Sequence, residues 1–197
     1  SNLKMIYTTL NRIREHSPCA HGWRKLLAHL GKTQADDEPL SFATILESNG
    51  LEDALWCCRV EPQYAKEWRL FAVECARRVQ HLMHDPWSLA ALDVAERYAH
   101  GLASDEELRA ARCAAADAAR SASQDEAWGA ARGAAWGAAW DAAADAAAGA
   151  ARGAAWGAAW DAAWGAAAGA AWDAAYDTAL DAARKEQSST FLKYVTE

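Results

Sequence analysis

A four-residue repeat runs through the C-terminal half of the chain and limits what this half can fold into. Over residues 108–185 each tetrad carries one variable residue, then in its central part Gly or Asp, then Ala-Ala. Ala is the best helix former, and Asp or Gly would not select strands. The repeat therefore predicts helices. A β-solenoid with short equal sides is the structural alternative, and the Ala-Ala pair in every tetrad argues against it.

The repeat cannot form one straight helix in a compact molecule. A tetrad advances about 400° on a helix of 3.6 residues per turn, so the stripe of variable residues drifts by about 40° per tetrad. Unbroken, the segment would span about 117 Å, whereas a compact chain of this size has a radius of gyration of about 16 Å. We therefore expect either an extended arm that needs a partner or several helices that fold back. The expected helices lie near 105–122, 125–147, 150–167 and 170–186.

Large aromatic residues occupy many of the variable positions. Residues 129–143 recur without change at 149–163, and each copy contains two Trp and one Arg. A covered Trp buries around 200 Å² of mostly apolar surface, so the first interpretation places the Trp residues in the core. The glycines cost about 1 kcal/mol each in a helix, which close helix approach could offset. The second interpretation is a Trp-lined groove, with Arg132 and Arg152 in equivalent positions, that stacks a flat ligand or grips a partner helix.

The first hundred residues read as short helices with ordinary start and stop signals. Apolar residues at helical spacing predict a helix over 3–15, and Asp85-Pro86 and Ser104 with Glu107 are typical helix starts. The predicted class is all-α, a multi-helix bundle or helical array whose C-terminal half consists of Ala-rich tetrapeptide-repeat helices. The predicted organisation is an N-terminal helical region over 1–103, repeat helices over 104–187 packed on it, and a C-terminal tail over 188–197.

Charge and cysteine content exclude some classes of function. The net charge of -7 argues against a nonspecific DNA-binding surface, which needs a basic face, so no nucleic-acid partner is expected. Charges interrupt every apolar window of membrane-spanning length, so no membrane partner is expected either. Five cysteines without a secretory signal suggest reduced thiols and a cytoplasmic location.

No motif predicts catalysis, a metal or a cofactor. His81 and His84 share a helix face but lack a third ligand at matched spacing, and a His-decorated helix end explains them as well. His16, Cys19 and His21 cluster loosely around a proline, as a loop would. Phosphate-binding loops need clustered glycines, whereas these glycines are spread through Ala-rich sequence. We therefore expect no enzyme, no cofactor and no metal site.

Two stretches outside the repeat resemble a known family. Residues 69–120, RLFAVECARRVQHLMHDPWSLAALDVAERYAHGLASDEELRAARCAAADAAR, are similar to Ala-rich helical proteins of bacteria and tailed phages. Members are labelled immunity proteins because they resemble the type-5 immunity proteins of polymorphic toxin systems. Residues 22–59, with GWRKLLAHLGKTQADDEPL and ILESNGLEDALWCCR, resemble the phage-borne branch. The resemblance implies an all-helical protein that acts by binding a toxin or a host defence component.

Three functional hypotheses follow. The first is a non-enzymatic cytoplasmic binding protein of immunity or phage counter-defence type that sequesters a protein partner. The second is a small-ligand binder, for example of nucleotides, that uses Trp and Arg between repeat helices. The third is a structural module that oligomerises with a second copy. The candidate binding residues are Arg132, Trp136, Trp140, Arg152, Trp156, Trp160 and Trp164.

Overall fold

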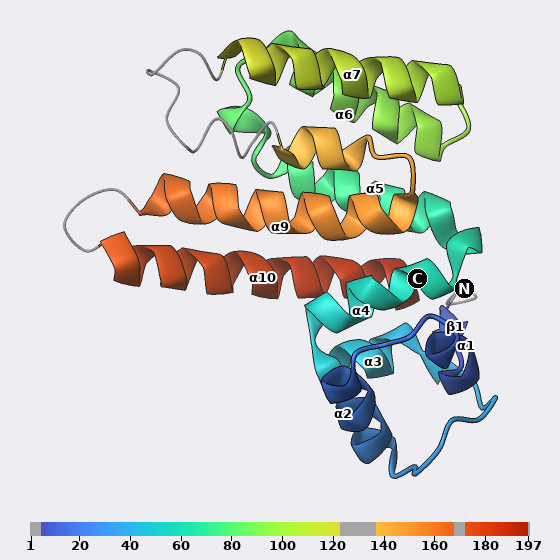
Figure 1. Ribbon diagram of the computed structural model, residues 1–197. Coiled ribbons are helices and arrows are strands. Elements are labelled where there is room, and N and C mark those ends of the chain that lie inside the picture. Colours follow the sequence, from blue (N-terminus) through green and yellow to red (C-terminus); the bar gives the residue numbers. More distant parts are fainter. Residues whose placement is uncertain (1–4, 123–136, 168–171, 197) are drawn as a thin grey trace. The chain divides into compact units, whose positions relative to one another are not determined.

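Helices make up nearly all of the secondary structure, as the sequence predicts. The computed structural model describes residues 5–122, 137–167 and 172–196, and the chain separates into two compact units (Figure 1). The first unit comprises Ser1–Tyr64 with Ser188–Glu197, and the second comprises Ala65–Gln187. The boundary thus falls at residue 64 rather than at residue 103, because α5 (Ala65–Arg77) packs with the repeat helix α9 (Ala147–Ala166) and α6 (Pro86–Ala99) packs with both α5 and α7 (Asp105–Ala122).

The first unit begins with a short strand where the sequence predicts a helix over 3–15. Strand β1 (Tyr7–Thr8) pairs antiparallel with β2 (Leu40–Ser41). The Ile6 amide also donates to the Val195 carbonyl, and the Ile6 carbonyl accepts from the Phe42 amide. These bonds to both sides hold the backbone extended. The helix α1 (Leu10–Arg14) therefore starts late, where the hydroxyl of Thr9 accepts the Arg12 amide at 3.1 Å.

Three further helices complete the N-terminal part of this unit. They are α2 (Ala20–Leu30), α3 (Phe42–Asn49) and α4 (Leu51–Cys57), followed by 3₁₀ turns at Cys58–Val60 and Pro62–Tyr64. Helix α2 ends at Gly31, whose φ of 66° is the left-handed conformation that glycine adopts without strain. The core of the unit consists of aliphatic and aromatic side chains, among them Ile6, Leu10, Ile13, Phe42, Ile45 and Leu55.

The last residues of the chain belong to this core rather than to a tail. Helix α10 (Trp172–Thr196) continues through residues 188–196, where the sequence analysis expects a tail. Phe191 and Val195 are fully buried, and the Phe191 ring lies 6.5 Å from that of Phe42. Burial of these two side chains keeps the last turns of α10 helical.

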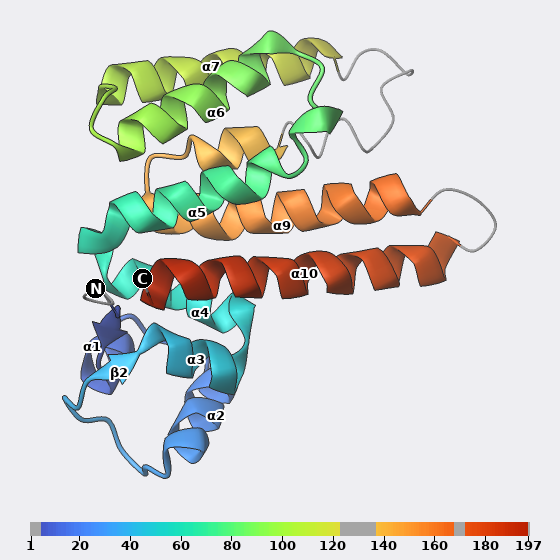
Figure 2. The same ribbon diagram turned by 180° about the vertical axis from the view of Figure 1, so that it is seen from behind.

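The second unit consists of helices from both the non-repetitive and the repetitive sequence. They are α5 (Ala65–Arg77), α6 (Pro86–Ala99), α7 (Asp105–Ala122), helical residues 137–142, α9 (Ala147–Ala166) and the first part of α10. Asp85 and Ser104 accept the Ser88 and Glu107 amides at the predicted starts of α6 and α7. Helix α6 packs between α5 and α7, and α9 packs along α5 (Figure 2).

A buried arginine marks a break in the repeat. Arg69 of α5 is almost fully buried and donates to the carbonyls of Ala142 at 2.9 Å and Asp145 at 3.0 Å. These carbonyls lie where the helix 137–142 ends, and the guanidinium satisfies and neutralises that helix end. The predicted helix over 125–147 therefore stops at residue 142, and its residues 125–136 lie outside the described part of the chain.

Candidate functional site

The repeat helix α9 buries its alanines and exposes its tryptophans. Ala150, Ala151, Ala154, Ala155, Ala158 and Ala159 are almost completely buried. Trp156, Trp160 and Trp164 are 37%, 49% and 37% exposed. The expectation that these Trp residues form core is therefore wrong, whereas the expectation that they share one face is consistent with their common exposure.

Helix α9 packs along α5, which buries small side chains such as Ala72 and Ala76 as well as Trp68 and Phe71. Protein interiors are close-packed, so a helix with small residues on its buried side can approach its neighbour closely. The Ala-Ala pairs of α9 give a smooth side that approaches closely. The large residue of each tetrad is then left on the other side of the helix.

Glycines of the repeat allow the helix 137–142 to approach α9. A Cβ added at Gly157 would lie 3.2 Å from the Ala138 backbone nitrogen and 3.3 Å from its Cα. A Cβ added at Gly153 would lie 2.6 Å from Cγ of Asp141. At both positions the lack of a Cβ on glycine allows this close contact. The close helix approach suggested from the sequence is thus present at these two positions.

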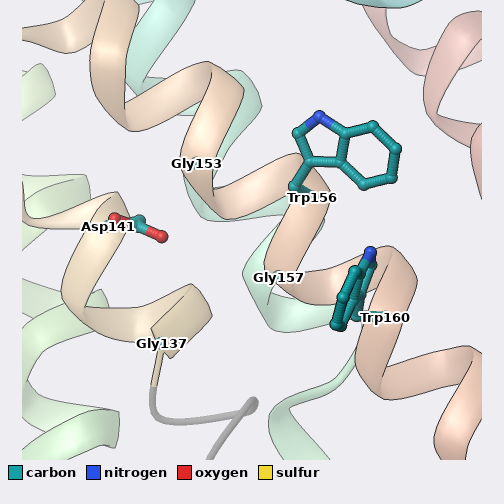
Figure 3. A pocket seen from close by; sticks show the side chains of 6 residues that line it. All are labelled: Gly137, Asp141, Gly153, Trp156, Gly157 and Trp160. Atoms are coloured by element: carbon teal, nitrogen blue, oxygen red, sulfur yellow. The ribbon is translucent and has the colours of Figure 1, made fainter.

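A pocket of about 400 Å³ opens beside this contact. It is lined by Gly137, Asp141, Gly153, Trp156, Gly157 and Trp160. Figure 3 shows the Asp141 side chain reaching from helix 137–142 toward Gly153, while both indoles project from successive turns of α9. The glycines form a floor without side chains, the indoles form an apolar wall, and Asp141 is the one ionisable residue among the described residues of the lining.

The Asp141 carboxylate lacks a local hydrogen-bond donor. It is half-buried, and within the described residues no side chain or amide donates a hydrogen bond to it. Burial raises the pKa of the Asp141 carboxyl, and the charge of Arg112 opposes that rise only in part. A half-buried acceptor of this kind favours a ligand that brings N–H donors.

Tryptophans of the repeat already hold arginines of the chain itself. The Arg112 guanidinium of α7 lies over the Trp140 ring at 3.7 Å, and that of Arg184 of α10 lies over the Trp156 ring at 4.1 Å. Both distances are within the range of a cation–π interaction. Trp164 instead meets aromatic rings of α10, with centroids 5.1 Å from Trp172 and 6.3 Å from Tyr176. Trp160 has no ring partner among the described residues.

The structure brings only part of the predicted site together. Trp156 and Trp160 share the pocket, Trp140 lies under Arg112, and Trp164 lies in the aromatic cluster with α10. Arg152 is exposed and lies outside the pocket lining, and Arg132 and Trp136 lie outside the described residues. The sequence analysis missed Asp141 and the glycines of the floor. Their signal was the Gly or Asp that follows every Trp of the repeat.

A second buried acid lies on α9. Asp161 is fully buried, and neither of its carboxylate oxygens has a hydrogen-bond partner. Burial raises the pKa of this carboxyl to about 8. Asp161 occupies in the second copy of the 15-residue block the position that Asp141 occupies in the first. The same repeat position is thus half-exposed in one copy and enclosed in the other.

The histidines and cysteines form no comparable site. Among the residues that the structure describes, no three His, Cys, Asp or Glu side chains are placed to hold a metal ion. Burial raises the pKa of the Cys57 and Cys75 thiols to about 12, so these thiols stay protonated and poorly nucleophilic. Cys19 caps α2, where its sulfur accepts the Gly22 amide at 3.4 Å.

Comparisons with known proteins found no match, so the candidate site is the main basis for proposing a function. No family model, curated protein or solved structure matches the chain. Within the described ranges, none of the helices combines the length and the apolar character that crossing a bilayer requires.

Proposed function

We propose that the protein is a non-enzymatic binding protein that sequesters a protein partner on the exposed side of α9. One observation carries this proposal: α9 buries Ala and leaves Trp156, Trp160 and Trp164 on its surface. We call these three residues the tryptophan face. All three large residues of the face lie on one helix of the second unit.

Exposed indoles leave apolar surface in contact with water, which is unfavourable for a chain that acts alone but useful for one that binds a partner. Each Trp presents a large apolar area, and clustered apolar area on a surface is typical of interaction sites. Trp is also enriched among the residues that dominate the energy of protein–protein interfaces. A repeat that places its largest side chain outward on successive turns is therefore better explained by a partner than by the stability of the fold.

Charge favours a protein partner over a nucleotide. A nucleotide would place phosphates beside the pocket, where Asp141 repels them and the described lining contains no basic residue. The chain carries a net charge of -7, which favours a partner with a basic surface. The resemblance of residues 22–59 and 69–120 to the immunity family supports the same class, with a toxin or a host defence component as the partner in the cytoplasm.

The test is binding by matched tryptophan variants. The wild-type chain, a Trp156→Ala/Trp160→Ala variant and a Trp87→Ala control are each immobilised and exposed to purified toxins and defence proteins. Trp87 lies on α6, is 50% exposed and is outside the pocket lining, so its substitution removes an equally exposed indole. We expect a partner that binds wild type and control equally and the double variant at least about tenfold more weakly.

Two outcomes would overturn this proposal. One is a partner whose affinity for the double variant equals that for the wild type. The other is self-association, seen by light scattering, that the double variant abolishes while every tested partner fails to bind. The second outcome would assign the tryptophan face to oligomerisation. A nucleotide that shifts the melting temperature of the wild type but not of the double variant would favour the small-ligand alternative instead.

A further inference from the structure

We propose that the pocket beside the tryptophan face receives an arginine side chain of the partner, which lies along Trp156 and Trp160 and pairs its guanidinium with Asp141. This inference rests on the proposed function, because it names the group by which the partner is held.

The lining offers what a guanidinium needs. A guanidinium is flat, carries five N–H donors and stacks on aromatic rings, while its planar edge matches a carboxylate. The pocket has a floor of three glycines, two indoles and one carboxylate without a hydrogen-bond donor among the described residues. Its volume of about 400 Å³ lies in the range of small-ligand pockets.

The chain itself gives a precedent for this pairing. Among the described residues, the guanidinium of Arg112 on α7 lies over Trp140, and that of Arg184 on α10 lies over Trp156. Trp160 is the most exposed of the three indoles on the tryptophan face and has no such partner among the described residues. A partner's arginine would give Trp160 the kind of contact that Trp156 already has with Arg184.

The surrounding charges favour arginine over an anion and over lysine. Asp141 is the only ionisable residue in the described part of the lining, and the guanidinium groups of Arg112 and Arg184 are already stacked on Trp140 and Trp156. Lysine would supply the charge but neither the flat stack nor the paired N–H groups, so it should bind more weakly. A neutral isostere would supply the shape without the charge.

The test uses single amino-acid derivatives with the full chain. N-acetyl-arginine methylamide, its lysine analogue and the neutral citrulline analogue are titrated into the ¹⁵N-labelled protein while the indole N–H signals are followed by NMR. The Trp160 signal is identified by its loss in Trp160→Phe. We expect a saturable shift of this signal with the arginine derivative, at least about threefold weaker binding with lysine, and no saturable shift with citrulline.

Variants of the carboxylate complete the test. Asp141→Asn keeps the shape and removes the charge, so the arginine derivative should bind it at least about threefold more weakly, whereas Trp87→Ala should bind as the wild type does. Thermal melts check that Asp141→Asn remains folded. Equal shifts with arginine and citrulline, or equal affinity of Asp141→Asn and wild type, would overturn the inference.

Failure here is distinguishable from failure of the proposed function. Suppose that a partner depends on Trp156 and Trp160, binds Asp141→Asn normally and is not displaced by the arginine derivative. This result would support the proposed function and contradict the inference that the partner is held by an arginine. A saturable, Asp141-dependent arginine site without any protein partner would support the pocket and count against sequestration of a protein.

Discussion

Helices α5 and α9 pack along each other but bury different kinds of residue. Helix α5 buries side chains of every size, from Trp68 and Phe71 to Ala72 and Ala76. Helix α9 buries Ala and turns its indoles outward. The two helices thus differ in which of their apolar residues they bury, although both lie in the same unit. The lesson is that apolar size alone does not determine the buried side of a helix.

The two helices also treat a buried charge differently. Arg69 of α5 is enclosed, but both of its bonded nitrogens have carbonyl partners and its guanidinium lies 5.1 Å from the Tyr98 ring centroid. Asp161 of α9 is enclosed with no hydrogen-bond partner for either oxygen. The non-repetitive helix thus provides hydrogen-bond partners for its buried charge. In the repeat, the tetrad pattern places Asp161 at a buried position where its oxygens have no such partner. Three predictions test this contrast, in order of expected size.

The largest difference should come from truncating one tryptophan on each helix. Trp68→Ala removes a fully buried side chain and should lower the free energy of unfolding by about 3–5 kcal/mol. Trp160→Ala removes a half-exposed one and should change it by less than about 0.5 kcal/mol. Urea unfolding followed by circular dichroism measures both. Equal losses would show that the indoles of α9 are core residues after all.

The next effect is a pH dependence from Asp161. Burial raises the pKa of this carboxyl to about 8, whereas in an unfolded chain it is near 3.9. Between these values the native state holds a proton that the unfolded state has lost, so the free energy of unfolding falls as pH rises. From pH 5 to pH 7 this amounts to about 3 kcal/mol.

The matched variant for that measurement is Asp161→Asn, which cannot ionise. Its free energy of unfolding, measured over the same pH range, should lack this fall, so the difference between variant and wild type should grow with pH. Parallel curves for the two proteins would mean that the Asp161 carboxyl titrates as an exposed group does.

The smallest effect compares two glycines of the repeat. Gly149→Ala adds a methyl group with no atom within 4 Å and should raise the free energy of unfolding by about 0.5–1 kcal/mol. Gly157→Ala has the same gain in helix propensity but pushes against the Ala138 backbone, so it should be neutral or destabilising. Thermal melts of both variants measure the sign. A stabilising Gly157→Ala would show that the two helices are further apart than described.

The sequence predicted the helical class and most helix starts because these depend on local chemistry. Caps such as Asp85 and Ser104 act within one turn of the chain. The orientation of α9 could not be predicted in this way. Its Ala and its Trp residues are both apolar, so which of them are buried depends on the helices that pack against α9. The strand at Tyr7 and the helical end of α10 likewise depend on residues far away in sequence.

The candidate site was predicted in part for the same reason. The shared face of Trp156, Trp160 and Trp164 follows from helical spacing alone. The pocket does not, because it needs the helix 137–142 to fold back so that Gly157 meets Ala138 and Asp141 meets Gly153. Which copy of a repeated Asp would be half-exposed, and which enclosed, could be decided only by that arrangement.

The arginine that marks the break in the repeat also fixes its alignment. Similar tetrads make neighbouring alignments of α9 on α5 close alternatives, because a slide of about 6 Å along the axis, with a rotation of about 40°, places Ala where Ala was before. The carbonyls of Ala142 and Asp145 come shortly before α9 in the chain, so such a slide would draw them away from the Arg69 guanidinium and leave a buried charge without partners. One non-repetitive side chain therefore sets the register of α9 along α5. This register in turn determines where each indole reaches the surface.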